Sequence, residues 1–212
     1  MKACPCKFIR FTLLLVSASL ILGATPMSAG EVSSGLKSGP YVGMDLGVNL
    51  ASDLTVPGEA SISLSPGVRW DVSAGYAFKL DDQLTFGPEL EIGLMVNSLD
   101  KASDGGGGSS IDGYFSQVPM MANGVFHWQV SSNWVAFAGA GIGYNYSYLD
   151  ITSDGGDSTG SETDFAWQGM AGLRYNFGSI EFGLGYKYLG FTPTGMDTVN
   201  DNAILLTYRV RF

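Results

Sequence analysis

Cysteine and histidine are nearly absent from this sequence, and their scarcity limits the chemistry that it can support. The only cysteines are Cys4 and Cys6, at the start of the chain, and His127 is the single histidine. So few sulfur and imidazole ligands leave no residue set for a transition-metal cluster. Because no cysteine follows residue 6, the main part of the chain contains neither a disulfide nor a thiol metal site.

Long apolar runs are also missing beyond the N-terminus, which argues against transmembrane helices there. At the N-terminus, three basic residues precede an apolar run at residues 11–22, and small residues follow at 28–30. This order predicts a cleaved signal peptide over residues 1–30, with an uncleaved membrane anchor as the alternative, and a periplasmic lead over residues 31–38.

The charge balance is acidic. Loss of the signal peptide removes three basic residues and no acidic ones, so that eight Lys and Arg oppose twenty Asp and Glu, for a net charge of −12. Such a charge argues against nucleic acid as a partner.

What the chain does contain is glycine, aromatic residues and a repeated alternation of apolar and polar positions. A period of two is the pattern of β-strands. The alternation recurs in eight segments: residues 40–50, 67–80, 84–97, 114–130, 134–147, 165–177, 180–191 and 202–212. The connections after the second, fourth and sixth segments are short and the others are long. The pattern predicts an eight-stranded antiparallel transmembrane β-barrel over residues 39–212, with short periplasmic turns and long extracellular loops.

The two faces of these segments differ in charge, because every charged residue falls on one of them. A soluble ligand-binding barrel would have an apolar interior, whereas here the charged face carries the glycines and suits a narrow lumen. The charged face predicts a closed lumen network of ion pairs, formed by Asp45, Asp71, Glu89, Glu91, Arg174, Glu181, Lys187, Arg209 and Arg211. Within it we expect pairing among Glu89, Glu91, Glu181, Arg174 and Arg209 in the periplasmic half. A hydrated lumen with unpaired charges is the alternative.

Four stretches resemble the small outer-membrane β-barrel proteins, including the opacity-protein-like and OmpA/OmpX-type "porin family" barrels. They are residues 118–123, 139–144, 165–175 and 208–212. The resemblance implies a location in the outer membrane of a Gram-negative-type bacterium, in contact with outer-membrane lipid and lipopolysaccharide. It also implies that Phe212 is the signal read by the barrel-assembly machinery. Members of this family act as adhesins, surface-shielding proteins, membrane-stabilising proteins or small channels.

Catalytic and metal-binding candidates are few. The alternation places His127 inside the barrel near a periplasmic turn, whereas lipid-modifying barrel enzymes use a histidine near the outer leaflet, so we expect no enzyme and no cofactor. In the long loops, Asp154 and Asp157 are candidate ligands for calcium or magnesium, with a solvated acidic loop as the alternative.

The function predicted from the sequence is therefore a monomeric, non-enzymatic barrel. It would serve envelope integrity or surface interaction and adhesion, with an extracellular ligand at the loops as a further partner. A small channel for ions or small solutes is the alternative, and a lipid-modifying enzyme depending on His127 is a third hypothesis.

Overall fold

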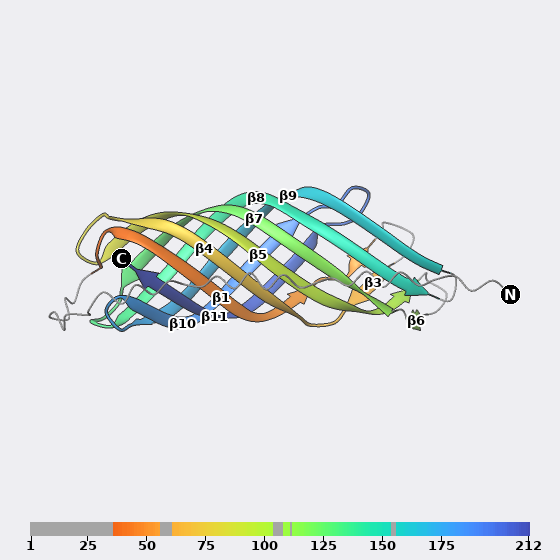
Figure 1. Ribbon diagram of the computed structural model, residues 1–212, viewed down its shortest axis with the longest axis horizontal. Coiled ribbons are helices and arrows are strands. Elements are labelled where there is room, and N and C mark those ends of the chain that lie inside the picture. The colour runs from red at the N-terminus through yellow and green to blue at the C-terminus, as the bar shows by residue number, and fades with distance from the viewer. Residues whose placement is uncertain (1–35, 56–60, 104–107, 111, 154–155) are drawn as a thin grey trace, which may run out of the picture. The chain divides into compact units, whose positions relative to one another are not determined.

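The computed structural model describes residues 36–55, 61–103, 108–110, 112–153 and 156–212 (Figure 1). Eight long strands form its sheet, in agreement with the predicted number. They are β1 (Gly39–Ala51), β4 (Gly67–Lys79), β5 (Leu84–Ser103), β7 (Asp112–Gln129), β8 (Trp134–Ser153), β9 (Gly156–Asn176), β10 (Ile180–Phe191) and β11 (Val199–Arg211).

The eight strands close on themselves as an antiparallel ring. The first strand, β1, pairs with β4 on one side and with the last strand, β11, on the other, so that Val42 lies opposite both Ala74 and Val210. The remaining neighbours pair in order around the ring, and β5 pairs with β7. The amide of Phe212 donates to the carbonyl of Pro40, which brings the C-terminus beside the start of β1. The predicted eight-stranded antiparallel barrel is confirmed.

Burial alternates along each strand as the period of two requires. In β7, the strand with the least regular pattern, Phe126 and Trp128 are exposed while His127 between them is completely buried. The outward apolar side chains form a continuous belt; Leu90, for example, is 70% exposed. Such exposure would be costly in water and suits contact with lipid.

Outward aromatic residues gather toward the two ends of the barrel. Phe86 and Phe126 lie with ring centroids 5.1 Å apart near the short turns. Trp167 and Tyr188 lie 4.8 Å apart nearer the long loops. Aromatic girdles of this kind mark the two interfaces of a membrane barrel.

Three tight turns connect strands at one end, here called the short-turn end, and local hydrogen bonds stabilise them. In the turn between β4 and β5, the amide of Gln83 donates to the side chain of Asp81 at 2.7 Å. In the turn between β9 and β10, Gly178 has a φ of 100°, which a residue with a Cβ adopts only with strain. These turns match the short connections predicted from the sequence.

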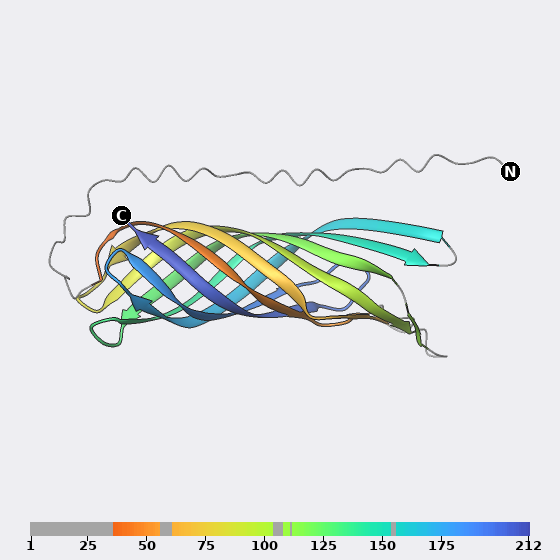
Figure 2. The ribbon, with the colours of Figure 1, turned by 60° about the horizontal axis from the view of Figure 1, so that its bottom comes forward.

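The opposite end, here called the loop end, is more ordered than the sequence pattern indicates. The long connection predicted at about residues 148–164 is mostly strand, because β8 and β9 remain paired out to Ser153 and Gly156. The backbone ladder continues through polar Ser, Thr and Asp residues, whose composition resembles that of a loop. Figure 2 shows the resulting β8–β9 hairpin projecting past the ends of β10 and β11.

Three short strands tie the other loops together at this end. They are β2 (Leu54–Thr55), β3 (Ser61–Leu64) and β6 (Gly108–Ser110). Strand β3 pairs with β2 and β5, and β6 pairs with β5. The carbonyl of Thr55 also accepts a hydrogen bond from the amide of Asp197 at 3.0 Å. Over the described ranges, no helix has the length and apolar character to cross a membrane.

Candidate functional site

The lumen near the short-turn end holds a first group of charged residues, which we call the short-turn cluster. Its members are Tyr41, Glu89, His127, Arg174, Glu181, Arg209 and Arg211. Arg209 is 2% exposed, and its guanidinium lies 2.8 Å from the carboxylate of Glu89. The same guanidinium donates to His127 Nε2 at 2.8 Å and stacks over the ring of Tyr41 at 4.0 Å. His127 thus accepts a hydrogen bond in a crowded interior.

Glu181 is the second carboxylate of the short-turn cluster and is fully buried. Its Oε1 accepts a hydrogen bond from Arg211 Nε at 2.5 Å, and its Oε2 lies 4.0 Å from Arg174 Nη1. Arg174 also donates to Thr207 Oγ1 at 3.1 Å and lies 3.7 Å from the ring centroid of Phe137. Buried charges are stable only when they are paired in this way.

A second group, the central cluster, lies further along the lumen and comprises Asp45, Arg69, Asp71, Glu91, Gln168 and Lys187. The ammonium of Lys187 lies 2.8 Å from Asp45, 2.9 Å from Asp71 and 2.8 Å from Glu91. Arg69 bonds Asp71 at 2.8 Å and is completely buried. Two cations therefore hold three carboxylates together.

The structure corrects the predicted pairing at two residues. Glu91 was expected beside Arg174 and Arg209 but lies in the central cluster, with Lys187 and Arg69. Its neighbour on the same face, Glu89, does reach Arg209. Two residues along a strand span about 6.6 Å, so that these two glutamates belong to different levels of the lumen. Arg69 faces inward as its position in the alternation indicates, although it was not included in the predicted network.

Buried amides continue the polar interior toward the loop end. Asn49 Nδ2 donates to Asn97 Oδ1 at 2.9 Å and to Asp201 Oδ1 at 3.0 Å. Asn145 Nδ2 donates to Gln117 Oε1 at 3.0 Å. These hydrogen bonds replace ion pairs at a level where the described strands carry few cations.

An apolar layer fills the lumen at the loop end, and the sequence pattern did not indicate it. Its buried members are Leu54, Met95, Leu99, Phe115, Met121, Ala166, Leu189, Phe191 and Val199. The inner face is therefore polar only over part of its length. Met95, Phe115 and Phe191 stand at inward positions of the alternation, which is the signal that would have revealed this layer. Together with the two charged clusters, it leaves the interior packed with side chains at several successive levels.

The projecting hairpin leaves one strand edge without a neighbour among the described residues. The last pair between β9 and β10 is Ala166 with Phe191, whereas β9 remains paired with β8 as far as Gly156. Residues 156–165 therefore have a ladder on the β8 side alone. The amide of Asn176 on β9 donates to the carbonyl of Asn133, on the side of β8. Successive amides of a strand point to opposite sides. The amides of even-numbered residues of β9 therefore face β8, and those of odd-numbered residues face the free edge.

Two predicted site assignments remain predictions. Asp154 and the side chain of Asp157 lie outside the described residues, and within the searched part no three His, Cys, Asp or Glu side chains are arranged to hold a metal ion. Phe212 is 75% exposed at the short-turn end, and its role as an assembly signal stays an expectation.

Comparison with known proteins agrees with this architecture. The family model described as "Outer membrane protein beta-barrel domain" matches residues 15–212. No curated protein sequence matches the chain.

Several solved structures share the fold. OprG from Pseudomonas aeruginosa superposes with a TM-score of 0.58 at 14% identity, covering 84% of this chain and 99% of that one. Neisserial surface protein A gives a TM-score of 0.55 at 20% identity, covering 82% and 98%. Ail, the attachment invasion locus protein of Yersinia pestis, in complex with the heparin analogue sucrose octasulfate, gives 0.50 at 16% identity, covering 82% and 99%. At these identities the likeness concerns the fold.

Proposed function

Since the chain belongs to the family of outer membrane protein β-barrel domains, we propose that it acts as a closed barrel in the outer membrane and binds a partner at the free edge of β9. The partner would be an extended, basic polypeptide segment that adds a strand to the projecting β8–β9 hairpin. The role is surface interaction without catalysis.

The free edge itself is the observation that carries this proposal. Among the described residues, ten positions of β9, 156–165, have a paired strand on one side only. An open edge presents unpaired N–H and C=O groups and is a template for strand addition. The hairpin extends past the ends of β10 and β11 (Figure 2), so a partner strand can lie along this edge beside the end of the barrel.

The charge of the edge favours a basic partner over a second copy of the chain. Asp157, Glu162 and Asp164 lie within the ten residues, and no basic residue does. Antiparallel pairing of two such edges would bring acidic residues together, which is unfavourable. A segment carrying Lys or Arg would meet complementary charge.

The packed lumen supports the closed state. Arg69, Lys187 and Arg209 each pair with a carboxylate from another strand while nearly completely buried. A solute that crossed the barrel would have to break these pairs and also displace the apolar layer. His127 has its ring against Arg209 and Tyr41, which argues against a role as a catalytic base.

Proline substitution at the free edge tests the proposal. The amide of Thr159 faces that edge, so Thr159→Pro removes one donor there while the β8–β9 ladder stays intact. Thr159→Ala keeps the donor and is the matched control. The measurement is anisotropy of a labelled peptide of alternating Thr and Lys, titrated with the protein in lipid nanodiscs.

We expect the wild type and Thr159→Ala to bind the peptide alike, and Thr159→Pro to bind it about tenfold more weakly. A peptide of alternating Thr and Glu should not bind. Equal affinity of Thr159→Pro and Thr159→Ala would show that the strand edge is not the binding surface.

A further inference from the structure

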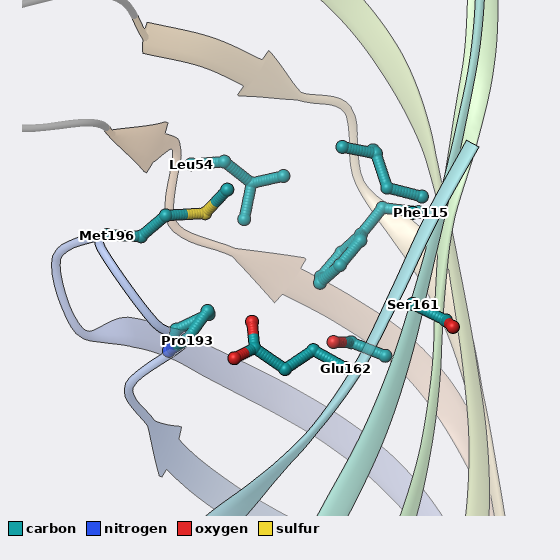
Figure 3. Close-up of a pocket in the computed structure, with 9 residues that line it drawn as sticks. Leu54, Phe115, Ser161, Glu162, Pro193 and Met196 are labelled. Atoms are coloured by element: carbon teal, nitrogen blue, oxygen red, sulfur yellow. The ribbon is translucent and has the colours of Figure 1, made fainter. Parts of the chain in front are cut away.

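A cavity of about 210 Å³ lies at the loop end, between the apolar layer and the projecting hairpin (Figure 3). Its walls come from β2, β7, β8, β9 and the connection between β10 and β11. Its volume is well above the ~10–15 Å³ that a single water needs and below the ~300–1,000 Å³ of drug-sized sites. It therefore suits a ligand of only a few carbon atoms.

Most of the wall is apolar. Figure 3 shows Leu54, Phe115, Pro193 and Met196 around one space, with Leu54 beside Met196. Hydrogen bonds hold the wall segments together: the amide of Asp197 donates to the carbonyl of Thr55 at 3.0 Å. Because these residues come from separate segments, the cavity is a product of the fold and not of one mobile loop.

One side of the cavity is acidic. Glu162 lines it, with its carboxylate toward Pro193, and Glu162 Oε1 accepts a hydrogen bond from the amide of Thr194 at 3.1 Å. Asp164 is the next inward residue of β9, one step nearer the barrel centre. It is only 8% exposed, and its Oδ2 has no hydrogen-bond partner among the described residues.

An unpartnered, buried carboxylate is unfavourable unless a donor or a cation reaches it. Within the described residues, neither Glu162 nor Asp164 forms an ion pair with a basic side chain. A ligand that supplied both a positive charge and a short apolar chain would satisfy the acidic side and the apolar wall at once.

We propose that this cavity binds a primary ammonium group carried on a short alkyl chain. The alkyl part packs against Phe115, Leu54 and Met196, and the ammonium donates hydrogen bonds to Glu162. Asp164 lies outside the cavity wall, one inward step further along β9, and adds its negative charge. Small anions are repelled by the same carboxylates. The site shares Glu162 and Asp164 with the acidic strand edge, but it needs no backbone pairing with residues 156–165, so the two proposals are tested separately.

Free alkylamines and the lysine side chain of a peptide share this chemistry. The test therefore uses both, n-butylammonium chloride and the blocked tripeptide Gly-Lys-Gly. The reporter is the methyl group of Met196, observed by NMR of methionine-methyl-labelled protein in nanodiscs and assigned with Met196→Leu. Met44 and Met120 on the lipid face serve as internal controls.

We expect n-butylammonium to shift the Met196 signal saturably and to leave Met44 and Met120 unchanged. Glu162→Gln and Asp164→Asn should each weaken this binding about tenfold. Asp100→Asn, which removes an exposed charge at the same end, should leave it unchanged. If the tripeptide saturates the site at similar concentrations, the site accepts the ammonium of a lysine side chain. If the tripeptide does not bind, the site accepts free amines alone.

Butan-1-ol has the same alkyl chain as n-butylammonium but no charge, so it measures the contribution of the apolar chain alone. We expect it to bind more weakly than n-butylammonium and with the same affinity in wild type and Glu162→Gln. If butan-1-ol and n-butylammonium bind alike, or if no saturable shift of Met196 appears in the folded wild type, the proposed ammonium site is wrong. Neither result depends on Thr159→Pro, so failure here leaves the strand-edge proposal standing.

Discussion

Arg209 on β11 and Glu89 on β5 meet 2.8 Å apart across the barrel, although their strands share no ladder. Both side chains are buried, at 2% and 4% exposure. The pair therefore links opposite walls of the lumen, which backbone pairing alone does not do. Such links make the barrel interior a structural element.

Removal of one partner should be much more harmful than replacement of both. Glu89→Gln leaves Arg209 buried without its carboxylate and should lower the free energy of unfolding by roughly 3–5 kcal/mol. The double variant Glu89→Leu with Arg209→Met removes both charges and should recover much of that loss. Urea titration of protein folded into liposomes, followed by the heat-dependent gel shift, measures both.

The exposed pair of Lys79 with Asp82 at the short-turn end is the control for this experiment, because it has the same 2.7–2.8 Å geometry without burial. Lys79→Met should leave the unfolding midpoint unchanged. Equal effects of Lys79→Met and Glu89→Gln would mean that burial does not decide the strength of these pairs.

The outward belt of apolar side chains predicts that a charge placed on the lipid face destabilises the fold. Leu90 is 70% exposed on β5 between the aromatic girdles, so Leu90→Arg places a charge against hydrocarbon. We expect a loss of about 2–4 kcal/mol in folding free energy in liposomes. Thr159→Arg on the projecting hairpin should fold as well as wild type. An unaffected Leu90→Arg would indicate that β5 presents its other face to lipid.

The alternation of side chains was sufficient to predict the barrel itself. It placed His127 inward between Phe126 and Trp128, and the spacing of turn residues located the three tight connections. These features depend on local chemistry, namely the period of the strand and the residues of the turns.

The pairing of charged residues in the lumen was less predictable, because it depends on how far neighbouring strands are shifted along one another. The partners of Glu91 come from β4 and β10, and no local rule indicates which charges reach the same level. The inward position of Met95 in the alternation marks it as a lumen residue, but which residues pack against it in the apolar layer follows only from the fold. The strand segments at 148–153 and 156–164 were missed because their pairing with each other, not their composition, orders them.

The exposed ion pair of Lys79 with Asp82 also predicts how the Asp82 carboxyl titrates. The hydrogen bond from Lys79, followed by its positive charge, holds the pKa of Asp82 below its usual value. Because both groups are exposed, the contribution of the pair to folding is too small to move the unfolding midpoint; it is present at neutral pH and is lost as the pH falls through the folded-state pKa. NMR titration of the Asp82 carboxyl should show its pKa rising in Lys79→Met. An unchanged pKa would mean that the pair does not form in solution.

The proposed closed lumen predicts how the barrel behaves in conductance measurements. The central cluster and the apolar layer lie in series, so wild-type protein in planar lipid bilayers should give no steady single-channel openings. Phe115→Ala with Phe191→Ala thins only the apolar layer and should remain closed. Adding Lys187→Ala and Arg209→Ala opens the central and short-turn clusters and releases Asp45, Asp71, Glu91 and Glu89 from their cations, and their charge should then admit cations. Each variant is first checked for the heat-dependent gel shift, so that only folded barrels are compared. Steady openings in the wild type would show that the lumen conducts, and the small-channel alternative would replace the closed barrel.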